Sequence, residues 1–517
     1  MSTRPPADPS LERALLVNLA VHALAMLSMA LVLLPMLPGG PVADPLERAR
    51  AIAASPWALR LGWVPWQLCA AVDVWMGVAM ARASWLPRAV TAPTLLVTLA
   101  AVIPDQWGET RWQTELVELA REAVRTGDAA AFAAREAQAF TATAAWGAGL
   151  YTLGALGWTL AFQRAGAWSR GLSLLSGPTW AVLGAASVAP MLPPAWRPPG
   201  PVVGAMNALG FVLLEAWLWL AAEAVLRRAR PDAHAGRHAP WRYPERGAVG
   251  ALWDFAANSR VAEALIEPMP VPPMVSDIGE VLYVNHLVEA ERLAPLVPAG
   301  LELQRLGPDG RYALFTWLTF RHGNFGFEFL GPLRRLLPSP VQTNWRIHVV
   351  DPRTGVRGIH FVTNAIDRAP PALAARLTTE GMPMHVLRAA SLERHPDGAV
   401  TLALDPGDGS APDGRCALRP CPTPALEGPW RACWGDWRAF LDYCVPQDRA
   451  MSTEPWLDRV TRHEIELGLD PARCEPLAGE VSSKRAAAYV GDAPPLCFRV
   501  PAVRFRYAVE RHDRLGA

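Results

Sequence analysis

The chain divides into two parts by the pattern of its hydrophobic and polar positions. Residues 1–226 consist mainly of long apolar runs, whereas the remaining 291 residues alternate between apolar and polar side chains. Six of the apolar runs approach or exceed the length that crosses a hydrocarbon core of roughly 30 Å. They are Ala14–Leu37, Leu61–Ala81, Ala89–Pro104, Thr141–Phe162, Gly171–Leu192 and Val202–Leu226. The pattern predicts an N-terminal all-α polytopic membrane domain of six transmembrane helices over residues 14–226.

Arginines beside the runs predict the orientation of this domain. If six helices alternate, one side of the membrane receives Arg4, Arg13, Arg82, Arg88, Arg164, Arg170, Arg227, Arg228 and Arg230. The other side receives Arg48, Arg50, Arg60, Arg197 and four arginines of one long loop. The totals are nearly equal, but the cluster after the sixth helix favours a cytoplasmic location for both termini. We therefore expect a multi-pass protein of the inner cell membrane, with a cytoplasmic tail over residues 1–13 and a cytoplasmic C-terminal domain.

The long loop, residues 105–140, is then expected to face outward. Its apolar positions fall on one helical stripe that ends at Gly127-Asp128, namely Leu116, Leu119, Ala120, Ala123 and Val124. Two interpretations remain open for this segment. It is an interfacial helix lying on the bilayer, or it is a ligand-sensing helical pair.

Ionisable groups inside the apolar runs are the candidate functional residues of the membrane domain. Asp73 and Glu215 lie in the middle of their runs, Glu223 lies near the end of the sixth run, and His22 lies in the first. A charged group at the bilayer centre costs roughly 2.5–3.5 kcal/mol on insertion scales. Asp73 and Glu215 therefore either serve a transport or proton pathway, or are satisfied by neighbouring groups within the bundle.

Residues 227–273 are predicted to form a juxtamembrane helix, over 248–266, followed by a proline-rich linker. This helix either lies along the membrane surface or packs on the soluble domain. The domain at 274–512 shows short alternating runs separated by turns that contain Pro, Asp and Gly, as hairpins require. The predicted strands are Ile278–Leu287, Leu301–Leu306, Arg311–Phe320, Gln342–Val350, Gly358–Ala365, Met384–Glu393, Ala399–Leu404, Val460–Leu467 and Leu496–Glu510. Two helices are expected, at Glu289–Leu296 and Asp436–Tyr443. The pattern indicates an α+β domain dominated by antiparallel sheet, curled into a barrel or a sandwich.

Composition agrees with this division and excludes several classes of function. Residues 1–226 hold 28 of the 97 charged groups, about 12% of their positions, and the rest of the chain holds 69, about 24%. A net charge of +1 gives no basic excess for nucleic acid. The seven cysteines lack a disulfide or zinc pattern, so no metal is expected. No phosphate-binding loop or dinucleotide fingerprint is found, so no cofactor is expected either.

Four motifs of the C-terminal half resemble the YqjF-like domain-of-unknown-function family over residues 274–510. They are Val297-Pro298-Ala299-Gly300-Leu301, the run Gln342–Val349, the run Gly358–Ala365 and the stretch Gly381–His385. This family is similar to acetoacetate decarboxylase, so the resemblance implies a β-barrel around a small apolar cavity. The membrane half shows no such resemblance.

The sequence departs from the decarboxylase at the residues that carry its chemistry. The resemblance implies a lysine pair after a Gly-x-Pro element, one member of which forms a Schiff base. The corresponding stretch here, Met382–Arg388, has no lysine, and an arginine cannot form the imine. The chain has a single lysine, Lys484, after a predicted Ser482-Ser483 helix cap. An exposed lysine there is a poor nucleophile, so Lys484 is a low-ranking candidate.

The predicted strand 342–349 carries the candidate ligand-binding residues. Alternation places Gln342, Asn344, Arg346 and His348 on one face of this strand. These side chains either point into a cavity, with Arg346 as the fixed charge for an anionic or carbonyl-bearing ligand, or form a solvent-facing polar surface. His360 on the partner strand, and His385 in the last motif, complete the set.

Three functional hypotheses follow. The leading one is an integral membrane protein whose cytoplasmic domain binds a small organic ligand, as a sensor or by sequestering it, and does not catalyse Schiff-base decarboxylation. The second is a membrane-anchored lyase or hydrolase that acts on a small organic acid through Arg346, His348 and His360. The third is a transporter-like membrane core, using Asp73 and Glu215, that the soluble domain regulates. The expected partners are the lipid bilayer and this ligand, and the sequence does not predict the oligomeric state.

Overall fold

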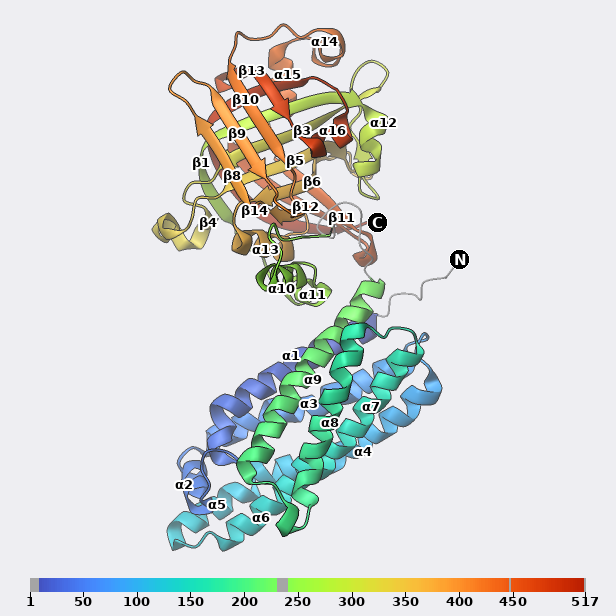
Figure 1. Cartoon of the computed structure of the whole chain (residues 1–517), viewed down its shortest axis with the longest axis vertical. Coiled ribbons are helices and arrows are strands. Elements are labelled where there is room, and N and C mark those ends of the chain that lie inside the picture. Colours follow the sequence, from blue (N-terminus) through green and yellow to red (C-terminus); the bar gives the residue numbers. More distant parts are fainter. Residues whose placement is uncertain (1–8, 230–239, 446–447, 516–517) are drawn as a thin grey trace. The chain divides into compact units, whose positions relative to one another are not determined.

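The computed structural model describes residues 9–229, 240–445 and 448–515, and it divides the chain into two compact units, residues 1–230 and 231–517 (Figure 1). The described part of the first unit is helical, and the second is built on a β-sheet. Arg4, Arg230 and most of the predicted tail over residues 1–13 lie outside the described residues.

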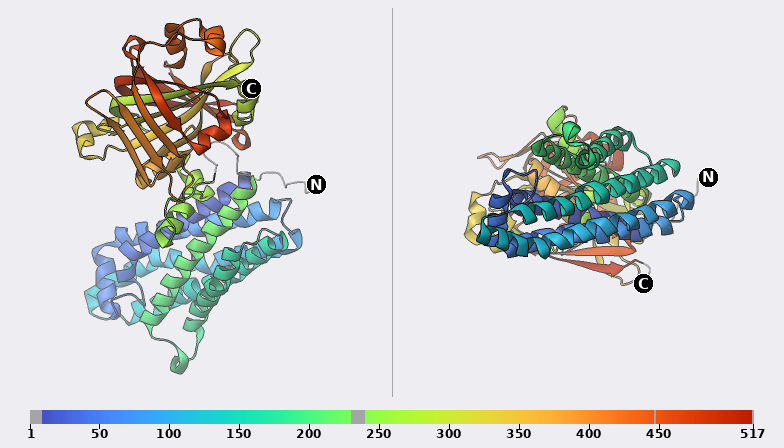
Figure 2. Two further views of the ribbon diagram at one scale, coloured as in Figure 1. Left: turned by 45° about the horizontal axis from the view of Figure 1, so that its top comes forward. Right: turned by 90° about the horizontal axis from the view of Figure 1, so that it is seen from below.

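Long helices run alongside one another in the helical unit (Figure 2). The α-helices are α1 Pro9–Ser28, α2 Pro45–Ala54, α3 Pro56–Arg82, α4 Arg88–Gln113, α5 Glu115–Thr126, α6 Ala130–Phe140, α7 Ala148–Arg164, α8 Arg170–Val188 and α9 Gly200–Ala229. Short 3-10 or π-helical turns connect them, namely η1 Met29–Leu33, η2 Leu34–Met36, η3 Thr141–Gly147, η4 Ala189–Met191 and η5 Pro194–Trp196.

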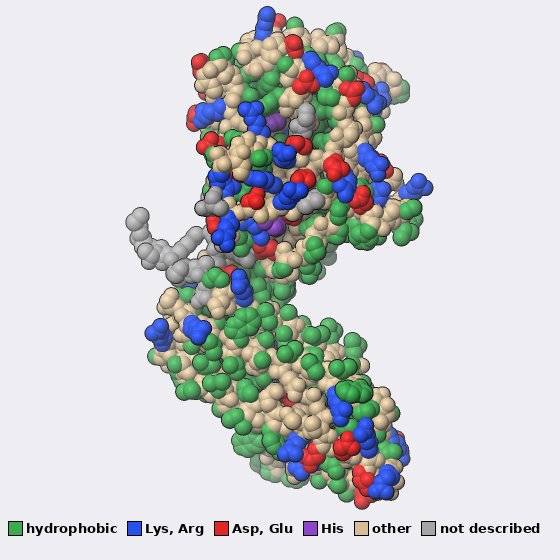
Figure 3. Space-filling model, turned by 180° about the vertical axis from the view of Figure 1, so that it is seen from behind, with side chains coloured by type: hydrophobic (Ala, Val, Ile, Leu, Met, Phe, Trp, Pro, Cys, Tyr) green, Lys and Arg blue, Asp and Glu red, His purple; other side chains and the backbone are tan. Residues whose placement is uncertain are grey.

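Five helical segments of this unit are long and apolar enough to cross a membrane. They are Pro9–Met36, Pro56–Arg82, Arg88–Thr126, Arg170–Met191 and Gly200–Arg228. They correspond to five of the six predicted runs. The other run, Thr141–Phe162, is helical but is divided between η3 and α7, and α7 has only 17 residues. A space-filling view shows hydrophobic side chains over the middle of the helical unit and a dense cover of charges on the β unit (Figure 3).

The segment expected to be an outward loop begins as a helix. α4 continues through Pro93 and Pro104 to Gln113, so Asp105 and Glu109 belong to this helix. Proline is tolerated in such helices because neighbouring helices and side chains satisfy the freed backbone groups. The rest forms a helical hairpin, α5 and α6, and α5 ends where Gly127 adopts a positive φ of 75°.

The hairpin is packed against other helices. The α5 residues Leu116, Val117, Ala120 and Ala123 are buried. Leu116, Ala120 and Ala123 belong to the predicted stripe, whereas Val124 of the same stripe is exposed. They form a core with residues of α2, α3 and the end of α4, including Ala49, Ile52, Trp63 and Trp112. Arg48 of α2 and Glu136 of α6 form a buried ion pair at 2.5 Å across this core.

The β unit contains one large sheet. Its strands are β1 Met274–Glu289, β2 Glu302–Leu303, β3 Tyr312–Arg321, β4 Gly326–Phe327, β5 Val341–Val350, β6 Arg357–Ile366, β7 Met384–Val386, β8 Ala389–Arg394, β9 Val400–Asp405, β10 Gly414–Pro420, β11 Arg449–Glu454, β12 Arg459–Gly468, β13 Glu475–Ser482 and β14 Pro495–Arg514. Most pairs are antiparallel, but β6 pairs in parallel with β7 and with β11, so the sheet is mixed. The predicted strand Met384–Glu393 is two strands, β7 and β8.

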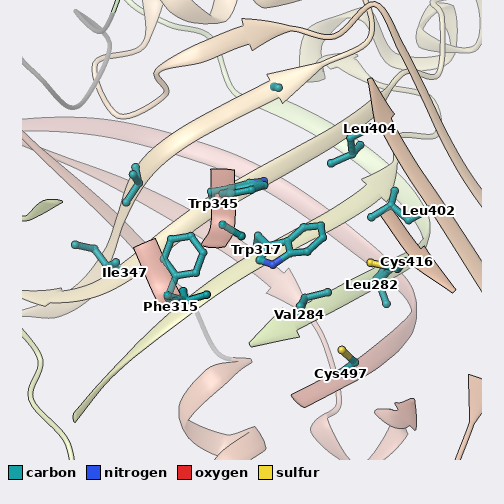
Figure 4. Close-up of a cluster of buried hydrophobic side chains, with 14 of the residues drawn as sticks. Leu282, Val284, Phe315, Trp317, Trp345, Ile347, Leu402, Leu404, Cys416 and Cys497 are labelled. Atoms are coloured by element: carbon teal, nitrogen blue, oxygen red, sulfur yellow. The ribbon is translucent and has the colours of Figure 1, made fainter. Parts of the chain in front are cut away.

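Seven strands of the sheet are paired in an order in which the last strand also pairs with the first. The order β1-β3-β5-β6-β11-β12-β14 is continuous, and β14 pairs again with β1 over twelve Cα pairs. The remaining strands β13, β10, β9 and β8 extend from β14 as a second layer. Side chains on the outer face of β1, β3 and β5 pack against this layer, as Figure 4 shows for Trp317 and Trp345 beside Leu402 and Leu404. The opposite face of these strands therefore points to the inside of the strand ring.

Seven α-helices and four 3-10 turns accompany the described strands of the β unit. The helices are α10 Ala248–Ala257, α11 Arg260–Ile266, α12 Ala290–Leu293, α13 Ala369–Thr378, α14 Gly428–Trp434, α15 Trp437–Cys444 and α16 Lys484–Val490. The turns are η6 Ala294–Leu296, η7 Glu328–Leu336, η8 Pro455–Leu457 and η9 Pro471–Arg473. α12 with η6 and α15 match the two predicted helices. α10 and α11 pack against α13, where the buried Arg376 donates to the Ala257 carbonyl at 2.8 Å. The predicted juxtamembrane helix is therefore part of the β unit.

Candidate functional site

The strand β5 separates two buried environments. Trp345, Ile347 and Val349 lie in the core between the strand ring and the second layer. Asn344 and Arg346 point the other way and line a cavity of about 50 Å³. Gln342 and His348 share the side of Asn344 and Arg346 by alternation and are only 5% exposed each. The polar face of the strand is thus buried, which removes the solvent-facing interpretation.

The cavity lies inside the strand ring and is mostly apolar. Six of the seven ring strands contribute to its lining, which consists of Ile278, Val281, Tyr283, Leu318, Phe320, Asn344, Arg346, Ile359, Phe361, Met382, Ile465, Leu467, Leu469, Val503 and Phe505. Tyr283, Asn344 and Arg346 are the only polar residues among them. A small polar cluster in an apolar cavity is the usual arrangement of a small-molecule site.

Arg346 is the dominant charge of this cavity. It is 3% exposed, its guanidinium lies over the Tyr283 ring at 5.4 Å, and its Nη2 is 3.5 Å from the carbonyl oxygen of Cys444. Its Nε donates to no group, and no carboxylate lies within 4.0 Å of it among the described residues. Burial lowers the pKa of Arg346 and raises the pKa of Tyr283. Arginine stays protonated in proteins, so the Arg346 guanidinium is a cation without an anionic partner among the described residues.

A chain of hydrogen bonds fixes Asn344 beside this arginine. His322 Nε2 lies 2.9 Å from Gln342 Oε1, and Gln342 Nε2 donates to Asn344 Oδ1 at 2.8 Å. Asn364 Nδ2 donates to the same oxygen at 2.7 Å. Both lone pairs of Asn344 Oδ1 are thus used, and its Nδ2 donates to no described residue. Asn344 and Arg346 both present hydrogen-bond donors to the cavity, which suits an anion.

His348 extends the polar face toward α15. Its ring stacks on Tyr443 with a centroid distance of 4.7 Å, and its Nε2 has no partner. Burial, followed by the charge of Arg346, lowers the pKa of His348 to about 3. The ring is therefore neutral at physiological pH, and an imidazole with so low a pKa is a weak general base.

The two other predicted histidines lie elsewhere in the β unit. His360 pairs with Ile347 in the strand register and so lies on the outer face of the ring, where its Nδ1 is 3.0 Å from the Met451 carbonyl. His385 is 2.7 Å from Ser410 Oγ. Burial lowers the pKa of His360 to about 4 and also lowers that of His385. The structure thus brings together four of the six candidates, and not these two.

The remaining candidates are distributed over both units. Lys484 is exposed at the start of α16, after the helix cap Ser483 that the sequence predicted. In the helical unit, Asn18 Nδ2 donates to Asp73 at 2.7 Å, and His22 lies 3.9 Å from the same carboxylate. Asp73 lines a cavity of about 470 Å³, and Glu215 is not among the residues that line it. Glu223 is paired with Arg227 at 2.8 Å.

Three ligand atoms of the metal-binding type approach one another in the β unit. Glu380, Glu510 and His512 place one such atom each within 4.8 Å of the others. Glu380 is already paired with Arg459 and accepts a hydrogen bond from Thr461. An arginine in contact with the carboxylate supplies the positive charge that a metal ion would bring.

Sequence reasoning missed several residues of these sites. Tyr283, His322 and Asn364 contact the candidate site from β1, from the end of β3 and from β6, and Tyr443 covers His348 from α15. Alternation within the predicted strands was the only signal that could have pointed to the strand residues among them. Alternation does not show which strands lie side by side, so it could not assign these residues to the site. Asp105 and Glu109 were missed because they were assigned to a loop.

Comparisons with known proteins agree with the predicted resemblance. Residues 277–425 match the family DUF2071, described as an uncharacterized conserved protein, so the resemblance is confirmed over this segment. The match leaves the helical half uncovered. No curated protein matches the chain.

Three solved structures are similar to the chain. The enduracididine biosynthesis enzyme MppR complexed with pyruvate is 15% identical, with 47% of this chain and 91% of that chain covered and a TM-score of 0.33. Acetoacetate decarboxylase from Legionella pneumophila is 11% identical, with 47% and 88% covered and a TM-score of 0.33. An acetoacetate decarboxylase-like enzyme from Sphingomonas wittichii RW1 is 13% identical, with 47% and 93% covered and a TM-score of 0.34.

Proposed function

We propose that this chain is an integral membrane protein whose β unit binds a small organic carboxylate inside a barrel of strands. The single observation that carries the proposal is Arg346, a buried guanidinium that faces an apolar cavity without a carboxylate partner. Its role is to sense or sequester this anion. Six transmembrane helices, cytoplasmic termini and a cytoplasmic β unit complete the proposal.

The energetics of an unpaired buried charge favour an anionic ligand. A buried ion that lacks its partner carries an effective penalty of several kcal/mol, because protein atoms do not replace its hydration. A ligand carboxylate supplies the missing charge and accepts hydrogen bonds from Arg346 and Asn344, and such charge-assisted bonds are roughly twice as strong as neutral ones. Apolar side chains such as Phe361 and Leu318 then enclose the short carbon chain of the ligand.

The volume of the cavity restricts the ligand to a small molecule. One water requires roughly 10–15 Å³ of such space, so 50 Å³ accommodates about four waters. Acetate fits this volume directly, and pyruvate is near its upper limit. Phosphorylated metabolites, nucleotides and fatty acids are too large for the cavity.

Binding is favoured over the hydrolase or lyase alternative by the positions of the histidines. A mechanism through Arg346, His348 and His360 requires all three to face one substrate. His360 is on the outer face of the ring, and the pKa of His348 is lowered to about 3. Decarboxylation through a Schiff base lacks its amine, since Lys484 is exposed on α16.

Isothermal titration of the full chain in detergent tests the proposal. Acetate and pyruvate are the probes, and acetamide and acetone are their uncharged counterparts. We expect saturable binding of an acid that Arg346→Met abolishes and that the matched control Arg394→Met, at an exposed site on β8, leaves intact. Equal binding by wild type and Arg346→Met contradicts the proposal, and consumption of the acid supports the enzyme alternative instead.

A further inference from the structure

A cavity in the helical unit is a second candidate site that the β unit does not account for. Its volume is about 470 Å³, and helices α1, α3, α4, α7, α8 and α9 all contribute to its lining. This volume lies in the range of roughly 300–1,000 Å³ that small-molecule pockets occupy. This cavity can hold a molecule several times larger than the cavity beside Arg346 can hold.

Acidic side chains converge on this cavity from two helices. Asp73 of α3 and Asp105 and Glu109 of α4 all line it. Tyr151 donates to Asp105 at 3.3 Å, and Gln106 donates to Glu109 at 2.9 Å. These donors orient the carboxylates without neutralising them.

Basic groups are scarce around the three carboxylates. No arginine or lysine is among the described residues that line the cavity. His22 is the only basic side chain there, and it lies 3.9 Å from Asp73. The lining thus combines three acids with one imidazole, and a ligand that carries positive charge complements it.

An independent observation also calls for a hydrogen-bond donor or a cation. Asn18 lines the same cavity and is fully buried, and its Nδ2 donates to Asp73. Its Oδ1 has no partner. In this orientation the amide directs its N–H group, and not its oxygen, at Asp73. A buried acceptor without a donor is unfavourable, and a bound ammonium group would supply the missing donor.

Aromatic rings make up much of the remaining lining. They are Trp63, Trp66, Trp112, Phe140, Trp158, Trp180 and Phe211. The faces of aromatic rings, indole above all, attract organic cations through the negative face of the ring quadrupole. Carboxylates together with indole rings recognise an ammonium group and an apolar body at once.

We propose that the helical unit binds an organic cation, an amine or quaternary ammonium compound with an apolar or aromatic body. Its charged group lies near Asp73, Asn18 and Glu109, and its body lies against the tryptophans. This site is separate from the carboxylate site of the β unit, and the proposal goes beyond that function.

Equilibrium binding of radiolabelled tetraphenylphosphonium to the full chain in detergent tests the proposal. We expect saturable binding that falls at least tenfold in Asp73→Asn and in Glu109→Gln. The matched control Glu122→Gln, at an exposed position of α5, should bind as wild type does. Benzyltrimethylammonium should displace the probe, whereas its uncharged isostere neopentylbenzene should not.

Two results would overturn the proposal. One is the absence of saturable binding to the wild type, and the other is equal binding in both acid variants. Asp73→Glu keeps the charge and should retain binding, so it separates loss of the site from loss of the fold. Displacement by neopentylbenzene as strong as that by benzyltrimethylammonium would show a purely apolar cavity and would equally exclude the cation.

Discussion

Buried arginines elsewhere in this protein, such as Arg48 and Arg499, bind carboxylates, whereas Arg346 has no carboxylate partner among the described residues. Arg48 binds both oxygens of Glu136 and two carbonyls, and Arg499 binds Glu280 and Glu475. The contacts of Arg346 are one long contact to a carbonyl, one aromatic face and the uncharged side chains of Tyr283 and Cys444. A charge left in this state is retained only where something else compensates for it, which is why we assign it to a ligand.

Arg346→Met provides a stability test of this assignment at the residue scale. Replacing a buried ion by an apolar side chain of similar length is often neutral or stabilising by about 1–4 kcal/mol. We expect the ligand-free variant to unfold at a free energy no lower than wild type, as measured by chemical denaturation of the β unit in the full chain. Acetate at 100 times its dissociation constant should stabilise wild type by about 2.7 kcal/mol and leave the variant unchanged.

Arg499→Met serves as the control for that measurement. It leaves Glu280 without its partner and is expected to destabilise the β unit. A destabilisation by Arg346→Met of the same size would mean that Arg346 serves the fold, and would count against a ligand role.

Buried histidines predict that the β unit is sensitive to acid. Burial lowers the pKa of His322 to about 4, of His348 to about 3 and of His360 to about 4, whereas unfolded imidazoles titrate near 6.5. Below pH 6.5 the unfolded chain therefore binds more protons than the folded one, and stability falls as the pH decreases toward 4. At pH 5 each histidine should cost about 1–2 kcal/mol of unfolding free energy relative to pH 7.

Denaturant unfolding at pH 7 and pH 5 measures this loss. His348→Phe retains the stacking on Tyr443 and removes one titrating ring, so its loss between the two pH values should be smaller than that of wild type. An identical loss in the variant would show that His348 does not contribute to the acid sensitivity.

At the scale of elements, local signals in the sequence identified turns better than they identified which strands pair with one another. The turns that end at Gly355 and Gly398 join β5 to β6 and β8 to β9 as predicted, and both glycines have a positive φ. The predicted hairpin at Gly310 is reduced to a single bridge between Leu306 and Tyr312, because β2 pairs with β5 instead. The strands β10, β11 and β13 were not predicted. Their pairings with strands distant in sequence, such as β11 with β6, are set by tertiary contacts that alternation does not reveal.

The start of the β unit shows which of two open placements the structure adopts. From the sequence, the helix over 248–266 either lies along the membrane or packs on the domain that begins near Met274, and the structure includes α10 and α11 in the β unit. Asn258 binds both backbone groups of Trp241, whose side chain is 3% exposed. We expect a fragment of residues 240–517 to melt at a higher temperature than one of residues 274–517, because the shorter fragment exposes the apolar surface that Trp241 and α11 cover.

Differential scanning calorimetry of the two fragments checks this expectation. A third fragment, residues 240–517 with Asn258→Ala, should have an intermediate melting temperature, since it loses the hydrogen bonds of this side chain to Trp241 and to the Asp254 carbonyl but keeps the helices. Equal melting temperatures for the long and short fragments would show that residues 240–273 are dispensable for the fold.

At the scale of the whole molecule, charge distribution was enough to separate the units but not to locate their cavities. A twofold difference in charge density marks the division near residue 227. The helical cavity depends on Asn18, Asp73 and Glu109, which are 55 and 36 residues apart in succession. No local pattern links such positions, and because the predicted run ended at Pro104 while α4 continues to Gln113, Asp105 and Glu109 were assigned to a loop.

Two separate units with two separate cavities predict independent behaviour. The two cavities have no lining residue in common, and each lies within one unit. We therefore expect calorimetry of the full chain in detergent to show two unfolding transitions. Acetate should raise the temperature of one and tetraphenylphosphonium that of the other, because a ligand stabilises only the unit that binds it.

The same experiment measures whether the units communicate. If binding at one site changed affinity at the other, linkage would require an equal and reciprocal effect, and each ligand would shift both transitions. Arg346→Met and Asp73→Asn are the matched variants, since each should abolish one shift and preserve the other. The opposite result would be a single unfolding transition that both ligands shift and that each variant changes. It would show that the two units unfold and bind as one coupled protein and not independently.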